Sequence, residues 1–385
     1  MRKVIVTISV FMIVILLIIT IYRVGDLEKR YVNGFFIFRS QENQKYENIG
    51  TFNVGYKIVD IQYKDETGKL QTMTTAIWYT TDKKTNEYAY QTVKDKLRLG
   101  KILSRVAVDA PVKKSSEKYP LLMFLHGGYI CGTESLFLTE YLASNGFIVA
   151  APDFHDDAYL CRIKGGRYDS LLTVLEKLKK FRSADASTSI RLLSEHQRVP
   201  GTSRVIDKLL EFNKDSKSLF FETIEENSIG VIGHSYGGRT ILGLIGAHPQ
   251  KEMLDKRIKS AVILSGAVFP FEDTLNNIKI PVMIMQGDDI DDVDTHSIPR
   301  RKVFDDAMPP KFFLRLKNGL HGSFYNGICD KYSDINKCQK SSEFAKVINS
   351  YSLAFFNRYL KNDLNGEILL NTQSPILKSY EKEFD

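Results

Sequence analysis

Short apolar runs alternate with segments of helical period along most of the chain. Runs with the length and composition of buried strands lie at 52–63, 73–80, 120–125, 147–151, 229–232, 260–265, 281–286 and 311–317. Helical patterns lie between them at 136–144, 240–247 and 300–307, and again at 342–360. This alternation predicts an α/β fold with a mostly parallel, doubly wound sheet and helices on both faces.

The segment 160–226 is polar, rich in lysine and helical in period. An apolar stripe at helical spacing is formed by Leu171, Leu172, Leu175, Leu178 and Phe181. A second helix is expected around 205–212. We therefore predict a helical insertion at 160–226 that shapes a substrate pocket. By contrast, residues 94–118 are charged and are expected to be irregular in part, and the polar residues after Asn362 to be loosely attached.

The first apolar run of the chain predicts a membrane segment and not a buried strand. Residues 4–22 carry no charge and follow Arg2 and Lys3, and at the helical rise they approach the thickness of a bilayer core. A cleavable signal peptide usually has a shorter apolar core and small residues before the cut, and Arg23-Val24-Gly25 does not supply them. We expect an uncleaved signal anchor, that is, a transmembrane helix, at 1–22. Secretion after cleavage is the alternative, and balanced flanking charges leave the orientation open.

These patterns divide the chain into four parts. They are an anchor at 1–22, a juxtamembrane connector at 23–50, an α/β domain at 51–361 that contains the insertion, and a C-terminal tail at 362–385. A length of 385 residues is enough for one large domain of this kind.

The net charge of +7 is spread out and forms no dense basic block with interleaved aromatics, which gives no support to nucleic-acid binding.

The four cysteines are Cys131, Cys161, Cys329 and Cys338. An even number behind an export-like N-terminus predicts disulfides and an extracytoplasmic domain. Cys329 and Cys338 close a short polar loop, which leaves Cys131 to pair with Cys161, each after a predicted strand. The alternative is four reduced thiols in a domain that faces the cytosol.

The sequence Gly233-His234-Ser235-Tyr236-Gly237 lies between a predicted strand and a predicted helix. A G-x-S-x-G sequence in that context is typical of a nucleophile elbow, in which the serine is raised on a strained turn. The flanking glycines are required because such a turn leaves no room for Cβ atoms. Ser235 is therefore the predicted nucleophile of a hydrolase.

A serine hydroxyl needs a base, and the base needs a carboxylate to fix its tautomer. In this architecture the chain order is Ser, then Asp or Glu, then His, each in a loop just after a strand. His321 follows the strand at 311–317 and is the predicted base. Several aspartates follow the strand at 281–286; Asp291 is the first choice for the acid and Asp289 the second.

Acyl transfer also needs backbone N–H groups that stabilise the oxyanion. One is predicted at Tyr236, next after the nucleophile, and the other at Gly128 or Tyr129 in the loop after the strand at 120–125. The aspartate-rich loop lacks the regular spacing of a calcium site, so no metal is expected. The proposed chemistry needs no cofactor.

Five motifs in the expected order resemble α/β-hydrolases of the platelet-activating-factor acetylhydrolase and dienelactone-hydrolase-like group. They lie at 124–128, 149–153, 229–238, 285–291 and 310–321. The resemblance implies the α/β-hydrolase fold and a carboxylic ester hydrolase with Ser235, Asp291 and His321 as its triad.

The sequence therefore predicts a membrane-tethered serine esterase that acts on a small-molecule or lipid ester through an acyl-enzyme. Apolar residues at Tyr159 and Leu160, with Phe269 and Phe271, are expected to bind the acyl chain. A peptidase or acyltransferase of the same fold is an alternative. An inactive, membrane-tethered binding module is another, although such proteins commonly lack the serine or the histidine.

Overall fold

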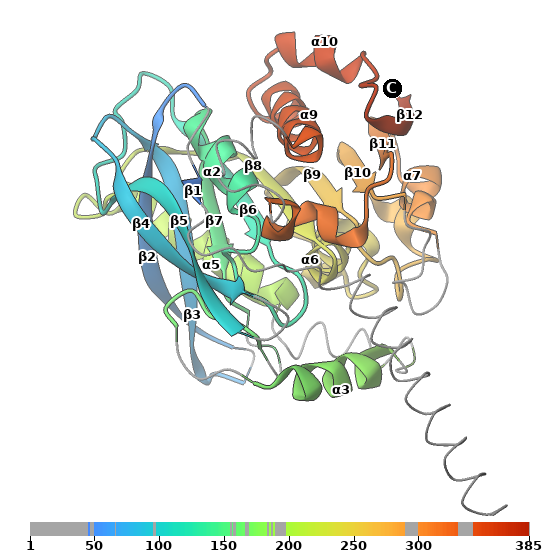
Figure 1. Ribbon diagram of the computed structural model, residues 1–385, viewed down its shortest axis with the longest axis horizontal. Helices are drawn as coiled ribbons and strands as arrows, with labels where there is room; N and C mark the ends of the chain where they lie inside the picture. The colour runs from blue at the N-terminus through green and yellow to red at the C-terminus, as the bar shows by residue number, and fades with distance from the viewer. Residues whose placement is uncertain are drawn as a thin grey trace, which may run out of the picture.

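The computed structural model describes most of the chain after its first 44 residues (Figure 1). The described residues are 45–46, 50–65, 67–94, 98–154, 156, 159–165, 169–182, 185, 188, 198–288, 299–329 and 342–384. The expected anchor at 1–22 and most of the expected connector at 23–50 lie outside them. Among the helices that are described, none combines the length and the apolarity needed to cross a bilayer.

Twelve strands form one continuous sheet, with the order β1-β5-β2-β3-β7-β6-β8-β9-β10-β11-β12 and with β4 paired to β5. Their bounds are β1 Lys45–Tyr46, β2 Asn53–Lys64, β3 Leu70–Thr81, β4 Asn86–Lys94, β5 Arg98–Val108, β6 Tyr119–Leu125, β7 Ile148–Pro152, β8 Ile224–His234, β9 Ile258–Leu264, β10 Val282–Gln286, β11 Lys311–Leu316 and β12 Leu377–Glu383. The six strands from β7 to β11 in this order run parallel. The predicted mostly parallel sheet is confirmed, and antiparallel strands extend both of its ends.

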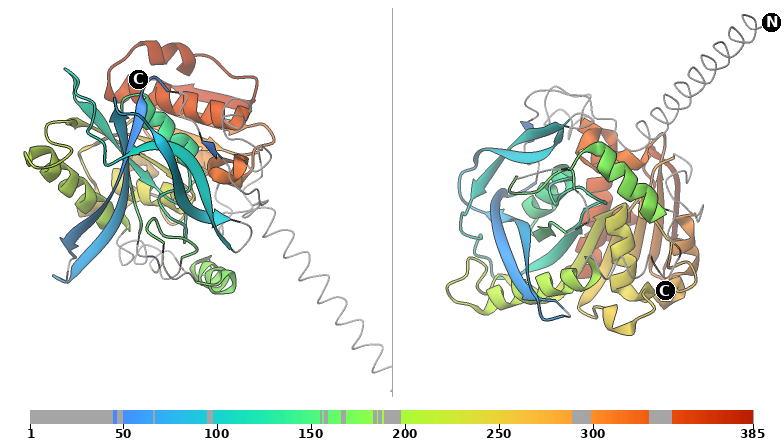
Figure 2. Two further views of the ribbon diagram at one scale, coloured as in Figure 1. Left: turned by 60° about the vertical axis from the view of Figure 1, so that its left-hand side comes forward. Right: turned by 90° about the horizontal axis from the view of Figure 1, so that it is seen from below.

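Helices cover both faces of the sheet (Figures 1 and 2). The longer helices are α2 Leu136–Ser144, α3 Leu171–Arg182, α5 Arg198–Lys214, α6 Tyr236–Leu242, α7 Arg301–Asp306, α9 Glu343–Leu360 and α10 Asn365–Leu370. Shorter helical segments are η2 Gly243–Ala247, η3 Lys251–Met253, η4 Leu275–Asn277, η5 His321–Phe324 and η6 Asn326–Cys329.

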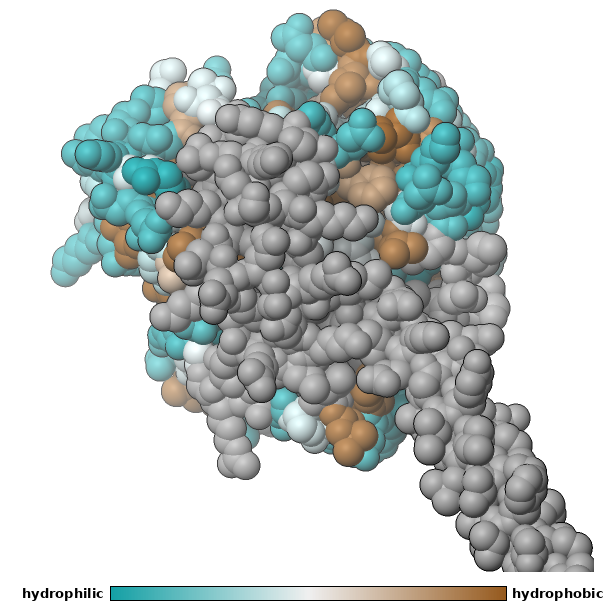
Figure 3. Space-filling model, viewed as in Figure 1, coloured by the Kyte–Doolittle hydropathy of each residue, from teal (hydrophilic) through white to brown (hydrophobic). Residues whose placement is uncertain are grey.

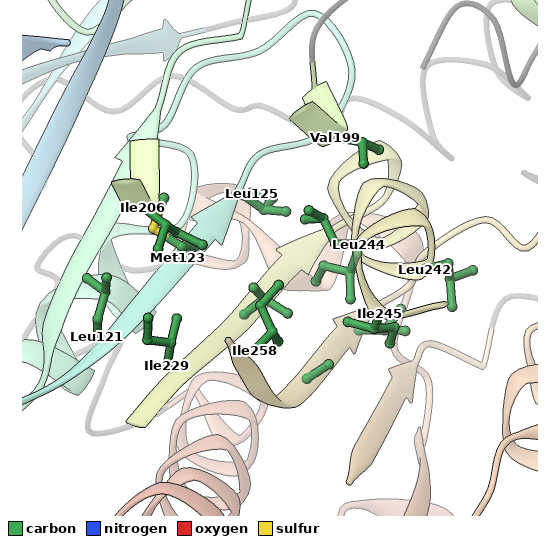
Figure 4. Packing of buried hydrophobic residues seen from close by; sticks show 14 of the residues in the cluster. Leu121, Met123, Leu125, Val199, Ile206, Ile229, Leu242, Leu244, Ile245 and Ile258 are labelled. Atoms are coloured by element: carbon green, nitrogen blue, oxygen red, sulfur yellow. The ribbon is translucent and has the colours of Figure 1, made fainter. Parts of the chain in front are cut away.

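Alternate residues of each central strand supply two separate cores. On β6, Leu122 and Phe124 pack with α2 and α9, whereas Leu121 and Met123 pack with α5 and α6. Figure 4 shows the second core, where side chains from β6, β8 and β9 meet those of α5, α6 and η2. A strand buried on both faces needs apolar residues at successive positions, which explains the unbroken apolar runs of the sequence.

One expectation about secondary structure is wrong, and another is incomplete. Residues 94–118 are irregular at 109–118, as expected in part, but they also contain β5, of which Arg98–Val106 pairs with β4. The C-terminal tail, expected to be loosely attached, folds into α10 and into β12, which pairs antiparallel with β11. Both strands lie at the periphery of the sheet, and charged residues interrupt their sequences, so they lack the apolar run that identifies a buried strand.

The amphipathic pattern in 160–226 does form helices. The predicted stripe from Leu171 to Phe181 lies on α3, and the predicted second helix is part of α5. Val205 and Leu209 of α5 are fully buried against the sheet, so this helix is one of the layers that cover it. On the face shown in Figure 3, apolar groups on the described surface are broken up by hydrophilic side chains, as is typical of protein surfaces.

Candidate active site

The G-x-S-x-G sequence forms the predicted strand, turn and helix. β8 ends at His234, α6 begins at Tyr236, and Ser235 between them has φ 54° and ψ −113°. This is a strained conformation for a residue with a side chain, and strain of this kind is concentrated at functional sites. A hydrogen bond from the Ser235 amide to the carbonyl of Leu264 at 2.9 Å ties the turn to the end of β9.

The glycines of the motif allow the turn to pack directly on β6. A Cβ atom at Gly237 would lie only 1.9 Å from the carbonyl oxygen of Leu125, and one at Gly233 would lie 2.8 Å from the same atom. No side chain fits at either position without moving the β6 backbone. The spacing of the two glycines therefore follows from the close approach of the elbow to its neighbouring strand.

His321 opens η5, just beyond the end of β11, and is 3% exposed. The centroids of the His321 and His234 rings are 4.8 Å apart, and His234 immediately precedes Ser235. The Nε2 atom of His234 lies 3.1 Å from the carbonyl oxygen of His321, which can only accept, so Nε2 of His234 carries the proton. The structure thus brings the predicted base to the nucleophile elbow.

Ser265 is a site residue that the sequence analysis missed. It follows β9, has φ 47°, and its buried hydroxyl lies 3.0 Å from Nδ1 of His321. Its amide donates to the carbonyl of Met285 at 2.7 Å, which fixes the residue to β10. Its position at the end of the strand predicted at 260–265, at the same edge as the elbow, is the signal that would have found it.

Asp291 and Asp289, the predicted acids, lie outside the described residues. Asp288, which precedes them, is described, and it forms ion pairs with Lys378 of β12 at 2.5 Å and with Arg315 of β11 at 3.3 Å. The hydrogen bond from Lys378 is the main cause that lowers the pKa of this carboxyl. Asp288 therefore belongs to an ion-pair network with β11 and β12.

The predicted second oxyanion donors, Gly128 and Tyr129, lie in the loop after β6. The Gly127 amide donates to Glu134 Oε1 at 2.7 Å, and the Tyr129 amide donates to Asp156 Oδ2 at 2.9 Å. The Gly128 amide lies between these two and donates to no group among the described residues. A Cβ built on Gly128 would lie 3.3 Å from the Tyr236 ring, so the loop backbone runs directly beside the start of α6.

His126 shapes this loop. Its Nε2 accepts a hydrogen bond from the Phe154 amide at 3.1 Å, and burial, with the nearby charge of Arg198, lowers its pKa to about 3. The ring is therefore neutral at physiological pH.

The predicted pairing of Cys131 with Cys161 is confirmed as a disulfide. It joins the end of the loop after β6 to the start of the segment 160–226. The pairing of Cys329 with Cys338 stays a prediction, because Cys338 lies outside the described residues. The disulfide therefore fixes the chain just after the predicted oxyanion loop.

The residues expected to bind the acyl chain fall into two groups. The Leu160 amide donates to the Tyr129 carbonyl at 2.7 Å, which places Leu160 and Tyr159 at the oxyanion loop. Phe271 is instead 1% exposed and packs against the ring of His248 within the core beneath α6 and η2. Phe271 is thus a core residue, because its ring fills the space between η2 and the sheet.

The fold and the elbow define the chain as an α/β-hydrolase. In the solved structures, a ferulic acid esterase from Streptomyces cinnamoneus superposes with a TM-score of 0.55 over 87% of this chain and 96% of that chain, at 18% identity. The family model described as platelet-activating factor acetylhydrolase, isoform II, matches residues 81–366. The chain belongs to this family.

Curated relatives have the same family name. The platelet-activating factor acetylhydrolase of Cavia porcellus is 26% identical over 299 residues, which cover 69% of this chain and 65% of the relative. That of Gallus gallus is 22% identical over 276 residues, 64% of this chain and 63% of the relative. The chain therefore spans less than two thirds of the length of these relatives.

Proposed function

We propose that this protein is a serine hydrolase that cleaves carboxylic esters through an acyl-enzyme intermediate. The observation that carries the proposal is the strained Ser235 at the junction of β8 and α6, with His321 packed against the preceding residue. Ser235 is the nucleophile and His321 the base. Asp291 is the proposed acid, with Asp289 as the alternative.

In the first half-reaction, Ser235 Oγ attacks the ester carbonyl while Nε2 of His321 takes the hydroxyl proton. The negative charge on the tetrahedral intermediate is stabilised by the amides of Tyr236 and Gly128. The Tyr236 amide is the first of α6 and comes directly after the nucleophile. The intermediate collapses when the imidazolium protonates the leaving alcohol. In the second half-reaction His321 deprotonates a water molecule, which attacks the acyl-enzyme, and then returns the proton to Ser235 as the carboxylic acid leaves.

Of the two residues predicted for the second oxyanion donor, Gly128 is favoured over Tyr129. The amide of Tyr129 already donates to the buried carboxylate of Asp156, so it is committed before any substrate binds. A donor for an oxyanion has to be placed in advance and has to remain open to the ligand. Gly128 meets the second condition and lies beside Tyr236, which supplies the other donor.

The proposed substrate is a short-acyl or lipid ester. Two relatives are named as acetylhydrolases of platelet-activating factor, which supports a short acyl group for the present chain. Tyr159 and Leu160 lie next to the oxyanion loop and are, together with Phe269, the proposed acyl-chain contacts. The segment 160–226 is proposed to set the preference for chain length.

We also propose that residues 1–22 tether the domain, at 51–361, to a membrane through the connector at 23–50. The uncharged run at 4–22 supports this, and the Cys131–Cys161 disulfide supports a location on the oxidising side of that membrane. Extraction of membranes with alkaline carbonate tests the tether: the full chain should stay in the pellet, and a chain without residues 1–22 should be released. Release of both would contradict it.

The activity is tested with p-nitrophenyl esters of increasing acyl length and with a phospholipid that carries an acetyl group at its second position. Wild type should hydrolyse the short esters and the acetyl phospholipid, and S235A and H321A should not. S260A changes another buried serine, which lies within β9 and away from the end of the strand that faces the elbow, and it serves as the matched control. Equal rates for wild type and S235A would overturn the proposal, and so would the absence of hydrolysis in folded wild type.

A further inference from the structure

Arg198, at the start of α5, has an unusual environment for an arginine. Its side chain is completely buried, and it forms a bidentate pair with Asp156, with distances of 2.8 Å from Nε to Oδ1 and 2.6 Å from Nη2 to Oδ2. Arginine is rarely buried without a partner because the loss of hydration is costly. A completely buried ion pair of this kind therefore needs a structural or functional explanation.

The remaining donors of Arg198 point at the loop after β6. Nη1 donates to the carbonyl of His126 at 2.9 Å, and Nη2 donates to the carbonyl of Gly127 at 3.1 Å. Asp156 in turn accepts the Tyr129 amide. The pair thus fixes the peptide groups on both sides of Gly128, and the Gly128 N–H points away from Arg198 because it belongs to the same trans peptide as the Gly127 carbonyl.

The same guanidinium also contacts the other proposed oxyanion donor. Its central carbon lies 4.2 Å from the centroid of the Tyr236 ring and 4.6 Å from that of Phe154. One planar cation is therefore stacked on the residue that opens α6 while it holds two carbonyls of the facing loop. The planar shape and the five donors of arginine allow this combination, which the ammonium group of lysine cannot reproduce.

The protonation states agree with a fixed ion pair. Burial alone would raise the pKa of Asp156, but the charge and the hydrogen bonds of Arg198 lower it. Burial likewise opposes the charge on Arg198, and Asp156 raises its pKa again. Both groups therefore stay charged over the pH range in which an esterase works.

We propose that Arg198 and Asp156 are positioning residues that hold the loop 126–129 against Tyr236 and so place the two oxyanion donors. This inference rests on the proposed function. Neither residue is proposed to contact the substrate. Their contribution is to fix in advance the distance between two amides that come from different parts of the chain.

The test uses R198K and D156N, with R257K as the matched control. Arg257 also forms a bidentate pair, with Asp255, and donates to Ser203 and Asp207 of α5, but it does not contact the loop after β6. Active sites are counted by labelling with a fluorophosphonate to completion, so that kcat is expressed for folded, competent molecules only. Binding of an alkyl boronic acid, which forms a tetrahedral adduct with the serine, reports on the oxyanion donors.

We expect R198K and D156N to lower kcat per active site by about 10- to 100-fold, a part of the about 10²–10³-fold cost of losing one oxyanion donor. KM should change little, and the boronic acid should bind more weakly by a similar factor to the loss in kcat. R257K should lower stability without these effects. If kcat per labelled site in both variants stays within about twofold of wild type, the positioning role is wrong.

The outcomes also separate this inference from the proposed function. If wild type neither reacts with the fluorophosphonate at Ser235 nor hydrolyses esters, the proposed function has failed. If wild type does both and the two variants match R257K, only the positioning role has failed. If R198K does not fold, D156N carries the test, because asparagine retains an acceptor for the Tyr129 amide.

Discussion

The hydroxyl of Ser265 lies 3.0 Å from Nδ1 of His321. A histidine that acts as a base through Nε2 must carry its proton on Nδ1, and a hydroxyl oxygen can accept the hydrogen bond from that group. Ser265 follows β9, whereas the proposed acid follows β10. The imidazole therefore contacts a hydroxyl from a second strand, at the same nitrogen that the proposed acid has to reach.

Replacing Ser265 by alanine should lower kcat by about 5- to 10-fold, because one neutral hydrogen bond contributes about 1 kcal/mol. KM should change little, since the hydroxyl is proposed to act on the base and not on the substrate. The measurement is steady-state hydrolysis of a short p-nitrophenyl ester. S260A is the control on the same strand, and an S265A enzyme as active as S260A would show that the contact has no role in orienting the base.

The acid is identified by comparing three aspartate variants. D291N should lower kcat by about 10⁴-fold, as expected when the carboxylate that fixes the tautomer of the base is replaced by an amide. D289N should have a small effect, and D288N should leave kcat unchanged because Asp288 is paired with Lys378 and Arg315. A large loss in D289N alone would move the role to Asp289. Near-normal activity in both would contradict an acid from this loop.

The disulfide between Cys131 and Cys161 should stabilise the fold. The two cysteines are 30 residues apart in sequence, and the loss of a bridge across a loop of this size costs about 3.6 kcal/mol. The double variant C131A/C161A should therefore have a lower free energy of unfolding in urea. Mass-spectrometric peptide mapping of the native protein without reductant should find the two cysteines linked. Two free thiols at these positions would contradict the bridge.

Glu140 should make stability depend on pH. It is fully buried on α2, accepts a hydrogen bond from Ser104 at 2.7 Å, and burial raises its pKa from 4.5 to about 8. Between these pH values the unfolded chain loses the proton and the folded protein keeps it. The contribution of Glu140 to stability is therefore fully present below about pH 4.5 and is lost as the pH rises to about 8.

The variant E140Q, which cannot ionise, should flatten this dependence and be more stable than wild type at pH 8. Urea unfolding at pH 5, 6.5 and 8 measures the slope, which one proton limits to about 1.4 kcal/mol per pH unit. E117Q, which changes an exposed glutamate, is the control. Parallel curves for E140Q and wild type would mean that this carboxyl does not titrate in the window.

The central strands and the elbow could be predicted from sequence because their signals are local. An unbroken apolar run, two glycines and a serine are enough to place β8, Ser235 and α6. The peripheral strands β5 and β12 could not be predicted in this way. Charged residues interrupt both sequences, and only pairing with a neighbouring strand makes them part of the sheet.

The site residues likewise divide into those with a local sequence signal and those without one. His321 was found from chain order, but Ser265 and Arg198 act through partners that are distant in sequence. Arg198 reaches the carbonyl of His126 across 72 positions, and Ser265 reaches His321 across 56. No local pattern distinguishes a buried arginine of this kind from the many solvated ones, so tertiary structure was needed to identify it.

The central claim is that Ser235 is an activated nucleophile. The most direct measurement is incubation with a fluorophosphonate, followed by intact mass and peptide mapping. The account predicts one adduct per wild-type molecule, on Ser235, with loss of esterase activity in proportion to labelling and with no adduct on S235A. Labelling of S235A to the same extent as wild type, or unlabelled wild type that still hydrolyses esters, would contradict it.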